Sequence, residues 1–209
     1  MPRKITKTQF RNKKILHRDK EVYKSFFKVG ILRKEDVLKI GMSNSKFSQL
    51  EKFKYVEKKL VEDRLTKEVV EVYKLTRSGV DFIKDKMSYH KPYYGSNSLE
   101  HDLGVLKLYM SVREQDPNFS ADMWRNEHEL RDMFKEYLDS LKEQNHSRYD
   151  EIYDRWQKGL ISTPDFAVVN EGQAHYVEIT TSAYTEEMKE AKAEFANEFS
   201  SQITFCRAY

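Results

Sequence analysis

The charged residues of this 209-residue chain are segregated along its length. Residues 1–91 carry 25 basic and 12 acidic side chains, a balance of +13, whereas residues 92–209 carry 12 basic and 22 acidic side chains, a balance of −10. A basic segment creates a positive field that attracts polyanions. We therefore expect the first segment to bind nucleic acid. The alternative is a compositional drift in which the lysines only face solvent.

A turn-rich stretch separates the two segments. Residues 88–98 contain a proline and a glycine among small and polar residues, and this composition is typical of a linker. The chain is long enough for two small domains, and 12 Phe and 13 Tyr supply large apolar side chains for two cores. The sequence predicts an α+β protein with a basic domain at 1–91, a linker at 92–98 and an acidic domain at 99–209.

Membrane-spanning and secreted proteins are classes that this sequence does not fit. No stretch approaches the roughly 18 consecutive apolar residues of a membrane-spanning helix, and residues 1–20 are rich in Lys and Arg without the apolar region of a secretory signal. Cys206 is the only cysteine, which excludes an internal disulfide and a cysteine-cluster zinc site. We expect a cytoplasmic protein that does not contact a membrane.

The basic segment shows the pattern of consecutive short helices. In residues 19–29 apolar residues recur at helical spacing, and Gly30 follows as a C-terminal stop. Residues 34–40 are also apolar at helical spacing and end at Gly41, after which Ser43 can cap a further helix. Helix, glycine turn and helix are typical of the helix-turn-helix motif.

Two β-rich runs follow the helices, at 55–61 and 69–75, and the polar residues between them predict a hairpin with a charged tip. Residues 75–83 then predict a closing helix capped by Thr76 or Ser78. A hairpin behind a helix-turn-helix is the wing of a winged helix-turn-helix domain. This is the fold that we expect for the basic domain.

The helix that opens at Ser43 is the expected recognition element, because a helix fits the major groove, where base edges are distinguishable. Short polar, amide and basic side chains near its N-terminus are suited to base edges and phosphate: Ser43, Asn44, Ser45, Lys46 and Gln49. Cations from the helix end and the hairpin are expected to contact phosphates: Lys52, Lys54, Arg64 and Lys67. For each residue alone, a solvated surface position is the alternative.

The N-terminal tail at 1–14 holds six basic side chains and no acidic one. Such an arm can follow a minor groove. A disordered, solubilising tail is the alternative, and the sequence leaves both interpretations open.

The acidic segment combines helical and extended patterns. Its two middle strands are separated by Glu171-Gly172, a turn that predicts a hairpin. The order of elements predicts a small α/β domain. The expected elements are helices at 98–112 and 129–142, strands at 163–170 and 174–182, a helix at 185–199 and a strand at 203–206.

One motif in this hairpin contains carboxylates at the spacing of a metal-binding site. Pro164-Asp165, followed across the hairpin by Glu178-Ile179-Thr180, resembles the PD-(D/E)XK motif of restriction-endonuclease-like folds. The resemblance implies that Asp165 and Glu178 hold Mg²⁺, and that a lysine at the position of Thr180 activates water. Residues two apart in a strand share a face, so the motif would gather these side chains in one site.

Thr180 departs from the motif, because a threonine supplies neither a positive charge nor a comparable polarisation of water. Lys189 or Lys192 on the next helix would have to replace the lysine, and Glu100 would serve as an extra acidic ligand. The alternative is that these carboxylates are ordinary ones that pair with nearby Lys or Arg. We therefore expect a degenerate site without a cofactor, with Mg²⁺ only if the domain is a nuclease.

Five short motifs follow one another along most of residues 30–200. They are Leu75-Thr-Arg-Ser-Gly79, the His101-Asp-Leu103 helix, Trp124-Arg-Asn-Glu127, Pro164-Asp165 and Val177-Glu178. Their order resembles that of the replication-relaxation family of plasmid and mobile-element proteins. The resemblance implies a DNA-binding factor in replication control and mobilisation, with a winged helix followed by a restriction-endonuclease-like domain.

The favoured hypothesis is a sequence-specific, double-stranded DNA-binding protein of a plasmid, phage or other mobile element, acting in replication, mobilisation or transcription control. We expect a homodimer on a pseudo-palindrome, assembled through the acidic segment, with replication or mobilisation proteins as further partners. A second hypothesis is a Mg²⁺-dependent DNA endonuclease that uses Asp165, Glu178, Glu100 and Lys189 or Lys192. A third is an acidic protein-binding module tethered to DNA.

Overall fold

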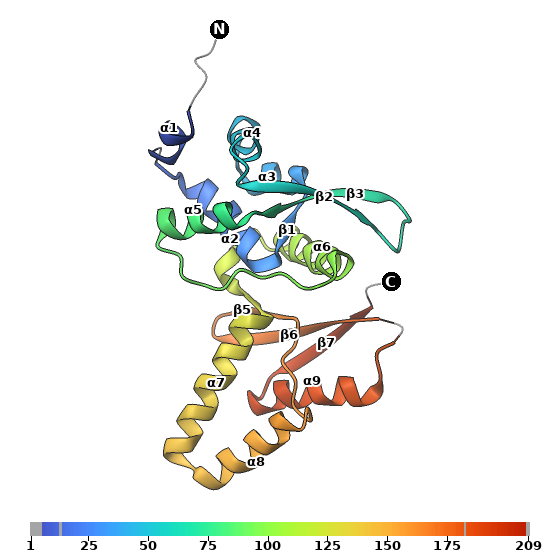
Figure 1. Cartoon of the computed structure of the whole chain (residues 1–209). Coiled ribbons are helices and arrows are strands. Elements are labelled where there is room, and N and C mark those ends of the chain that lie inside the picture. Colours follow the sequence, from blue (N-terminus) through green and yellow to red (C-terminus); the bar gives the residue numbers. More distant parts are fainter. Residues whose placement is uncertain (1–5, 13, 182, 208–209) are drawn as a thin grey trace. The chain divides into compact units, whose positions relative to one another are not determined.

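The computed structural model is a mixed α+β structure with two β-sheets, which confirms the predicted class (Figure 1). It describes residues 6–12, 14–181 and 183–207. The chain forms two compact units, Met1–Ala121 and Asp122–Tyr209. The charge segregation follows this division, because the first unit carries 27 basic and 16 acidic side chains, a balance of +11, and the second carries 10 and 18, a balance of −8.

The boundary between the units lies later in the chain than the predicted linker at 92–98. Helix α6 (Leu99–Gln115) belongs to the first unit, where it packs against the helix His17–Val29 and the sheet of that unit. The predicted linker is itself held there, since the Tyr94 backbone N–H donates to the Phe27 carbonyl at 3.0 Å and the Tyr94 side chain is buried. The charge pattern therefore located the change of composition but not the end of the first unit.

The first unit contains the elements that the basic segment predicts. Its three-stranded antiparallel sheet has the order β1-β3-β2, and β2 and β3 form the predicted hairpin. The strands are β1 (Ile31–Leu32), β2 (Val56–Glu62) and β3 (Val69–Leu75). The helices before α6 are α1 (Lys7–Asn12), α2 (His17–Val29), α3 (Lys34–Ile40), α4 (Asn44–Lys52) and α5 (Arg77–Met87).

Local signals account for where these helices begin and end. Gly41 follows α3 with a φ of 127°, a conformation that favours glycine. Ser43 caps α4 and Thr76 caps α5, each by accepting a backbone N–H three residues later. Gly79 is required by packing, because a Cβ there would lie 2.0 Å from the Tyr55 carbonyl oxygen. The Leu75–Gly79 motif is thus a helix start pressed against the preceding strand.

Aromatic side chains fill the core of the first unit. The Tyr55 and Phe82 rings stack with their centroids 4.5 Å apart, and Phe10 of α1 lies against both. Phe10 is buried, so α1 is docked on the unit and this part of the predicted arm is not a disordered tail. The rest of that arm, at 1–5 and 13, lies outside the described residues.

The second unit is a four-stranded sheet packed with helices. The order is β4-β5-β6-β7, antiparallel except for the parallel pair β6 and β7, which α9 connects. The hairpin, helix and last strand that the sequence predicts are therefore confirmed. The strands are β4 (Trp124–Asn126), β5 (Phe166–Asn170), β6 (Gln173–Thr180) and β7 (Gln202–Arg207), and the helices are α7 (Glu127–Gln144), α8 (His146–Gln157) and α9 (Glu186–Glu198).

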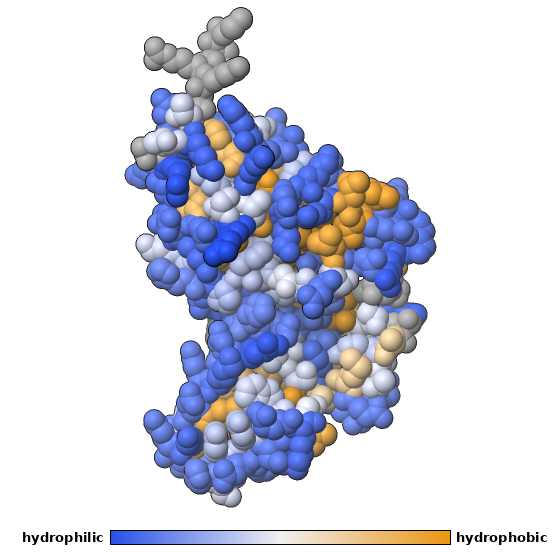
Figure 2. Space-filling view, viewed as in Figure 1, coloured by the Kyte–Doolittle hydropathy of each residue, from blue (hydrophilic) through white to orange (hydrophobic). Residues whose placement is uncertain are grey.

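None of the helices in the described parts of the chain is both long and apolar enough to cross a membrane. Hydrophilic side chains cover most of the face of the molecule seen in Figure 2. One apolar area stands out on that face, over the outer half of the β2–β3 hairpin.

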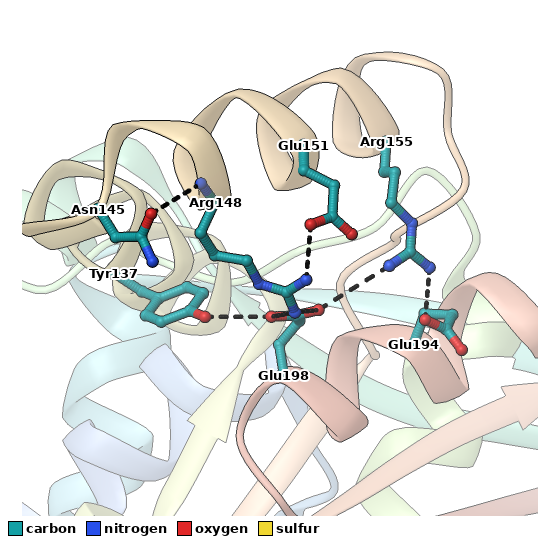
Figure 3. A network of polar contacts seen from close by, with 7 residues as sticks. All are labelled: Tyr137, Asn145, Arg148, Glu151, Arg155, Glu194 and Glu198. Carbon is teal, nitrogen blue, oxygen red and sulfur yellow. Dashed lines mark hydrogen bonds and ion pairs between the residues drawn. The ribbon is translucent and has the colours of Figure 1, made fainter. Parts of the chain in front are cut away.

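A buried carboxylate joins the three helices of the second unit (Figure 3). Glu198 at the end of α9 accepts hydrogen bonds from Arg148 of α8 at 3.0 Å and from the Tyr137 hydroxyl of α7 at 3.1 Å. Arg155 adds a second cation, 4.0 Å from the same carboxylate, and also bonds Glu194. All these groups have partners within the network, so we assign it to holding α8 in place rather than to ligand binding.

Candidate functional site

The exposed end of α4 carries the predicted base-contacting residues. Ser43, Asn44 and Ser45 are exposed, and the first turn of α4 contains no acidic residue. The Gln49 amide lies one turn further along and donates to the Ser45 carbonyl at 3.1 Å. This helix start therefore presents short hydrogen-bonding side chains beside a partial positive charge.

Lys46 is placed differently from its predicted role. Its ammonium group lies 2.6 Å from Oδ2 of Asp19, a carboxylate on α2 that is 1% exposed. The same oxygen accepts the backbone N–H of Leu16 at the start of α2. Lys46 thus fixes α4 against α2, and we remove it from the set of proposed phosphate contacts.

Replacing Lys46 with methionine is expected to destabilise the first unit by about 2–3 kcal/mol, because the buried Asp19 carboxylate loses its cation. Chemical denaturation of the full-length protein measures this change. Lys52→Met on the same helix is the matched control, because Lys52 is exposed and should change stability by less than about 0.5 kcal/mol. Equal stability of the two variants would show that the ion pair contributes nothing.

Free cations gather where α4 ends and α5 begins. The Lys54 carbonyl accepts hydrogen bonds from the Thr76 hydroxyl at 2.8 Å and the Ser78 hydroxyl at 3.2 Å, so this backbone lies against the start of α5. Lys52, Lys54 and Arg77 are all exposed, and none of them forms an ion pair with the described residues. We name these three residues the basic cluster.

Arg77 is not among the residues that the sequence predicts to contact DNA, although it occupies the middle of the Leu75–Gly79 motif. The sequence predicts a helix cap at Thr76 or Ser78 in that motif, which also carries part of the family resemblance, but it assigns Arg77 no contact. The cap at Thr76 gives the missing signal, because it makes the exposed Arg77 the first residue of a helix whose first turn contains no acid.

The hairpin cations predicted to contact phosphates have acidic neighbours. Arg64 forms an ion pair with Glu100 of α6, and the Lys67 ammonium lies 3.9 Å from the Glu62 carboxylate. Glu100 is therefore engaged within the first unit, whereas the two predicted metal ligands, Asp165 and Glu178, belong to the second. Its predicted role as an extra acidic ligand finds no support in this pairing.

The hairpin of the second unit brings Asp165 and Glu178 together, as predicted. Phe166 pairs with Val177, which places the two acidic residues side by side at the end of the ladder. The Asp165 backbone N–H donates to Glu178 Oε2 at 2.9 Å, and the Ile179 N–H donates to Asp165 Oδ2 at 2.7 Å. Each carboxylate thus also accepts a hydrogen bond from the backbone on the opposite side of the hairpin.

Lys192, not Lys189, reaches the Glu178 carboxylate of this pair. Its ammonium group lies 3.0 Å from Glu178 Oε1 and donates to the Thr163 carbonyl at 2.6 Å. Lys189 turns instead to Glu186 on its own helix, at 2.7 Å. The predicted use of Lys189 is therefore not supported by its position, and Lys192 is the cation of the site.

The environment of Glu178 opposes its ionisation. Burial raises the pKa of this carboxyl group, and the neighbouring Asp165 raises it further. Lys192 and a hydrogen bond from the Tyr184 hydroxyl, 2.5 Å from Oε1, act in the opposite direction. Burial, and then the bond to Glu178, raise the pKa of Tyr184, so this hydroxyl stays protonated and remains a donor.

The side chains of this site do not fit a resident divalent cation as they stand. Both Glu178 oxygens accept hydrogen bonds, and the place beside Oε1 that a metal ion would take holds the Lys192 ammonium. Among the described residues, no group of three or more His, Cys, Asp or Glu side chains is arranged to bind a metal. The buried Glu178 carboxylate thus has an ammonium group as its ion-pair partner, beside the half-buried Asp165.

A cavity of about 1000 Å³ in the second unit lies elsewhere. Residues of the β5–β6 turn and of β7 line it, together with Arg125 and His175, and neither Asp165 nor Glu178 is among the lining residues. The carboxylate pair is therefore not at the floor of this cavity.

Comparisons with protein-family models, with curated proteins and with solved structures find no match for this chain. The resemblances to the replication-relaxation family and to restriction-endonuclease-like folds therefore depend on the short motifs alone. Function has to be argued from the arrangement of residues.

Proposed function

We propose that the protein binds double-stranded DNA, with α3 and α4 as a helix-turn-helix and the β2–β3 hairpin as the wing of a winged helix-turn-helix domain. One observation carries the proposal. The exposed, acid-free start of α4 follows α3 across the Gly41 turn, in a unit whose balance of charge is +11. A polyanion with a groove wide enough for a helix matches these features.

Two groups of residues would contact the DNA, one the base edges and the other the phosphates. Asn44 and Ser45 at the start of α4 have the hydrogen-bonding capacity to contact base edges in the major groove. The basic cluster of Lys52, Lys54 and Arg77 would neutralise phosphates on one flank of α4. Base contacts supply specificity, whereas the cations supply most of the affinity and its dependence on salt.

The proposed setting is replication, mobilisation or transcription control of a plasmid, phage or mobile element. Its support is the resemblance of the five motifs to those of the replication-relaxation family. Replication or mobilisation proteins are the partners that this setting implies for the acidic second unit, whose balance of charge is −8.

Within this proposal the second unit is a restriction-endonuclease-like domain that does not cleave DNA. The support is the position of Lys192, whose ammonium pairs with Glu178, one of the two carboxylates that a nuclease would use for its metal. The endonuclease hypothesis predicts divalent-metal-dependent nicking of supercoiled DNA that disappears in Asp165→Ala. Such nicking would replace our assignment.

Fluorescence anisotropy with duplexes chosen from a random pool tests the DNA-binding proposal. Since bound phosphates release counterions, affinity is expected to fall by about two orders of magnitude or more between about 50 and 200 mM salt. An enriched consensus sequence would support specific recognition. Affinity that is undetectable at low salt, or that does not change with salt, would contradict the proposal.

A further inference from the structure

The apolar area on the β2–β3 hairpin has no role in the DNA contacts proposed above. Leu60, Leu65 and Val69 are 64%, 61% and 67% exposed, more than any other large apolar side chain described. The register pairs Leu60 with Glu71 and Glu62 with Val69, so Leu60 and Val69 are diagonal neighbours on one face of the hairpin. Figure 2 shows this apolar area on the surface.

The hairpin is the electrically neutral part of a basic unit. Residues 56–75 contain five basic and five acidic side chains, so the whole balance of +11 lies outside them. Acidic neighbours occupy its outer cations: Lys58 lies 2.5 Å from Glu71 and Lys59 lies 3.2 Å from Glu57, besides the pairs of Arg64 and Lys67. A wing whose cations lie beside carboxylates attracts a phosphate backbone only weakly.

The tip of the hairpin is also held in a fixed shape. The buried Asp63 carboxylate accepts the Leu65 N–H at 3.1 Å and lies 2.5 Å from the Lys107 ammonium of α6. The Asp63 backbone N–H donates to the Glu68 carbonyl at 2.8 Å, which closes the turn. Leu65 is thus presented from an anchored turn, and an ordered apolar surface loses little entropy when it binds.

We propose that this face of the hairpin binds the same face of a second copy of the chain. Charge favours this choice of partner, because two copies of the first unit, each with a balance of +11, repel each other least where the contact surface is neutral. Residues 56–75 are such a surface, and they carry apolar side chains at the centre with paired charges around them, as protein interfaces do. A twofold axis makes the contact self-complementary.

The dimer would place two copies of α4 for two half-sites of a DNA pseudo-palindrome, and only this role rests on the proposed function. It also moves the expected assembly surface from the acidic segment to the basic unit. Self-association itself follows from the hairpin and needs no DNA.

Light scattering of the full-length protein after size exclusion tests the proposal, with Leu60→Glu and Val69→Glu combined as the variant. We expect the wild-type protein to have twice the chain mass of 25.0 kDa and the variant to have once that mass. Leu160→Glu is the matched control, because Leu160 is 53% exposed and lies in the second unit. This control variant should remain a dimer. Combined Leu60→Ser and Val69→Ser should also shift the mass, without adding charge.

The circular dichroism spectrum should be unchanged in the variants, since both side chains face solvent within one chain, and the melting temperature should fall only by the stability that dimer formation adds. A single chain mass for the wild-type protein at sub-millimolar concentration would overturn the proposal, as would a double mass for both variants. If the variant is monomeric and neither it nor the wild-type protein binds a DNA half-site, the dimer proposal stands. The proposed DNA-binding function is then wrong. A variant of unchanged mass with weakened half-site binding assigns the hairpin to DNA and overturns the proposal.

Discussion

Replacing Lys52, Lys54 and Arg77 together with alanine is expected to weaken DNA binding by at least about a hundredfold at moderate salt, with no loss of stability. Each cation that neutralises one phosphate contributes about 0.9 to the slope of log affinity against log salt concentration, so the slope should become shallower by about 2.7. These three side chains are exposed and have no ion pair among the described residues, so removing them leaves no buried charge behind. Anisotropy titrations at several salt concentrations measure both quantities.

The control for this variant removes the same charge elsewhere in the first unit. Lys74, Lys84 and Lys86 lie on β3 and in the last turn of α5, away from its capped start. Their combined replacement with alanine should change the slope by less than about one phosphate contact. Equal effects of the two triple variants would mean that DNA binding depends on net charge alone, and α4 would lose its place as the recognition helix.

Most of the first unit could be predicted because its signals are local. Gly41 ends one helix and Ser43 caps the next, and both act on residues at most four positions away. The roles of Lys46 and of α6 could not be predicted in this way. Asp19 is 27 residues from Lys46, and an apolar helix pattern does not state which surface the helix will cover.

The carboxylate site shows the same limit. The turn at Glu171-Gly172 fixes the strand register, so the meeting of Asp165 and Glu178 follows from the sequence. The choice between Lys189 and Lys192 does not, because both lie on α9 and differ by less than one helical turn. Only the rotation of α9 about its axis, set by packing of Phe195 in the core, selects Lys192.

Replacing Lys192 with methionine is expected to lower the stability of the second unit by about 3–5 kcal/mol, which corresponds to roughly 10 °C or more in melting temperature. The change removes the cation beside Glu178 and leaves the Thr163 carbonyl without its donor. Lys189→Met is the matched control on the same helix, since its ion pair with Glu186 is exposed and should contribute less than about 1 kcal/mol.

The loss in Lys192→Met should depend on pH in a defined direction. Lys192 lowers the pKa of Glu178 against the effects of burial and Asp165, so the variant should have a pKa raised further above that of an unfolded glutamate, about 4.3. A carboxyl group whose folded pKa is raised stabilises the fold below its unfolded pKa, and this contribution disappears as pH rises through the folded pKa. The deficit of the variant should therefore be smallest near pH 4, where only the lost hydrogen bond to the Thr163 carbonyl remains, and largest near pH 8.

Divalent cations should distinguish the two proteins as well. In Lys192→Met the ammonium beside Glu178 is removed, so an ion that binds only the folded state should restore stability as its concentration rises. We expect millimolar Mn²⁺ to raise the melting temperature of Lys192→Met by several degrees and to leave the wild-type protein and Lys189→Met nearly unchanged. A wild-type rise of several degrees that vanishes in Asp165→Ala would show that metal displaces the ammonium, and it would favour the nuclease over the degenerate site.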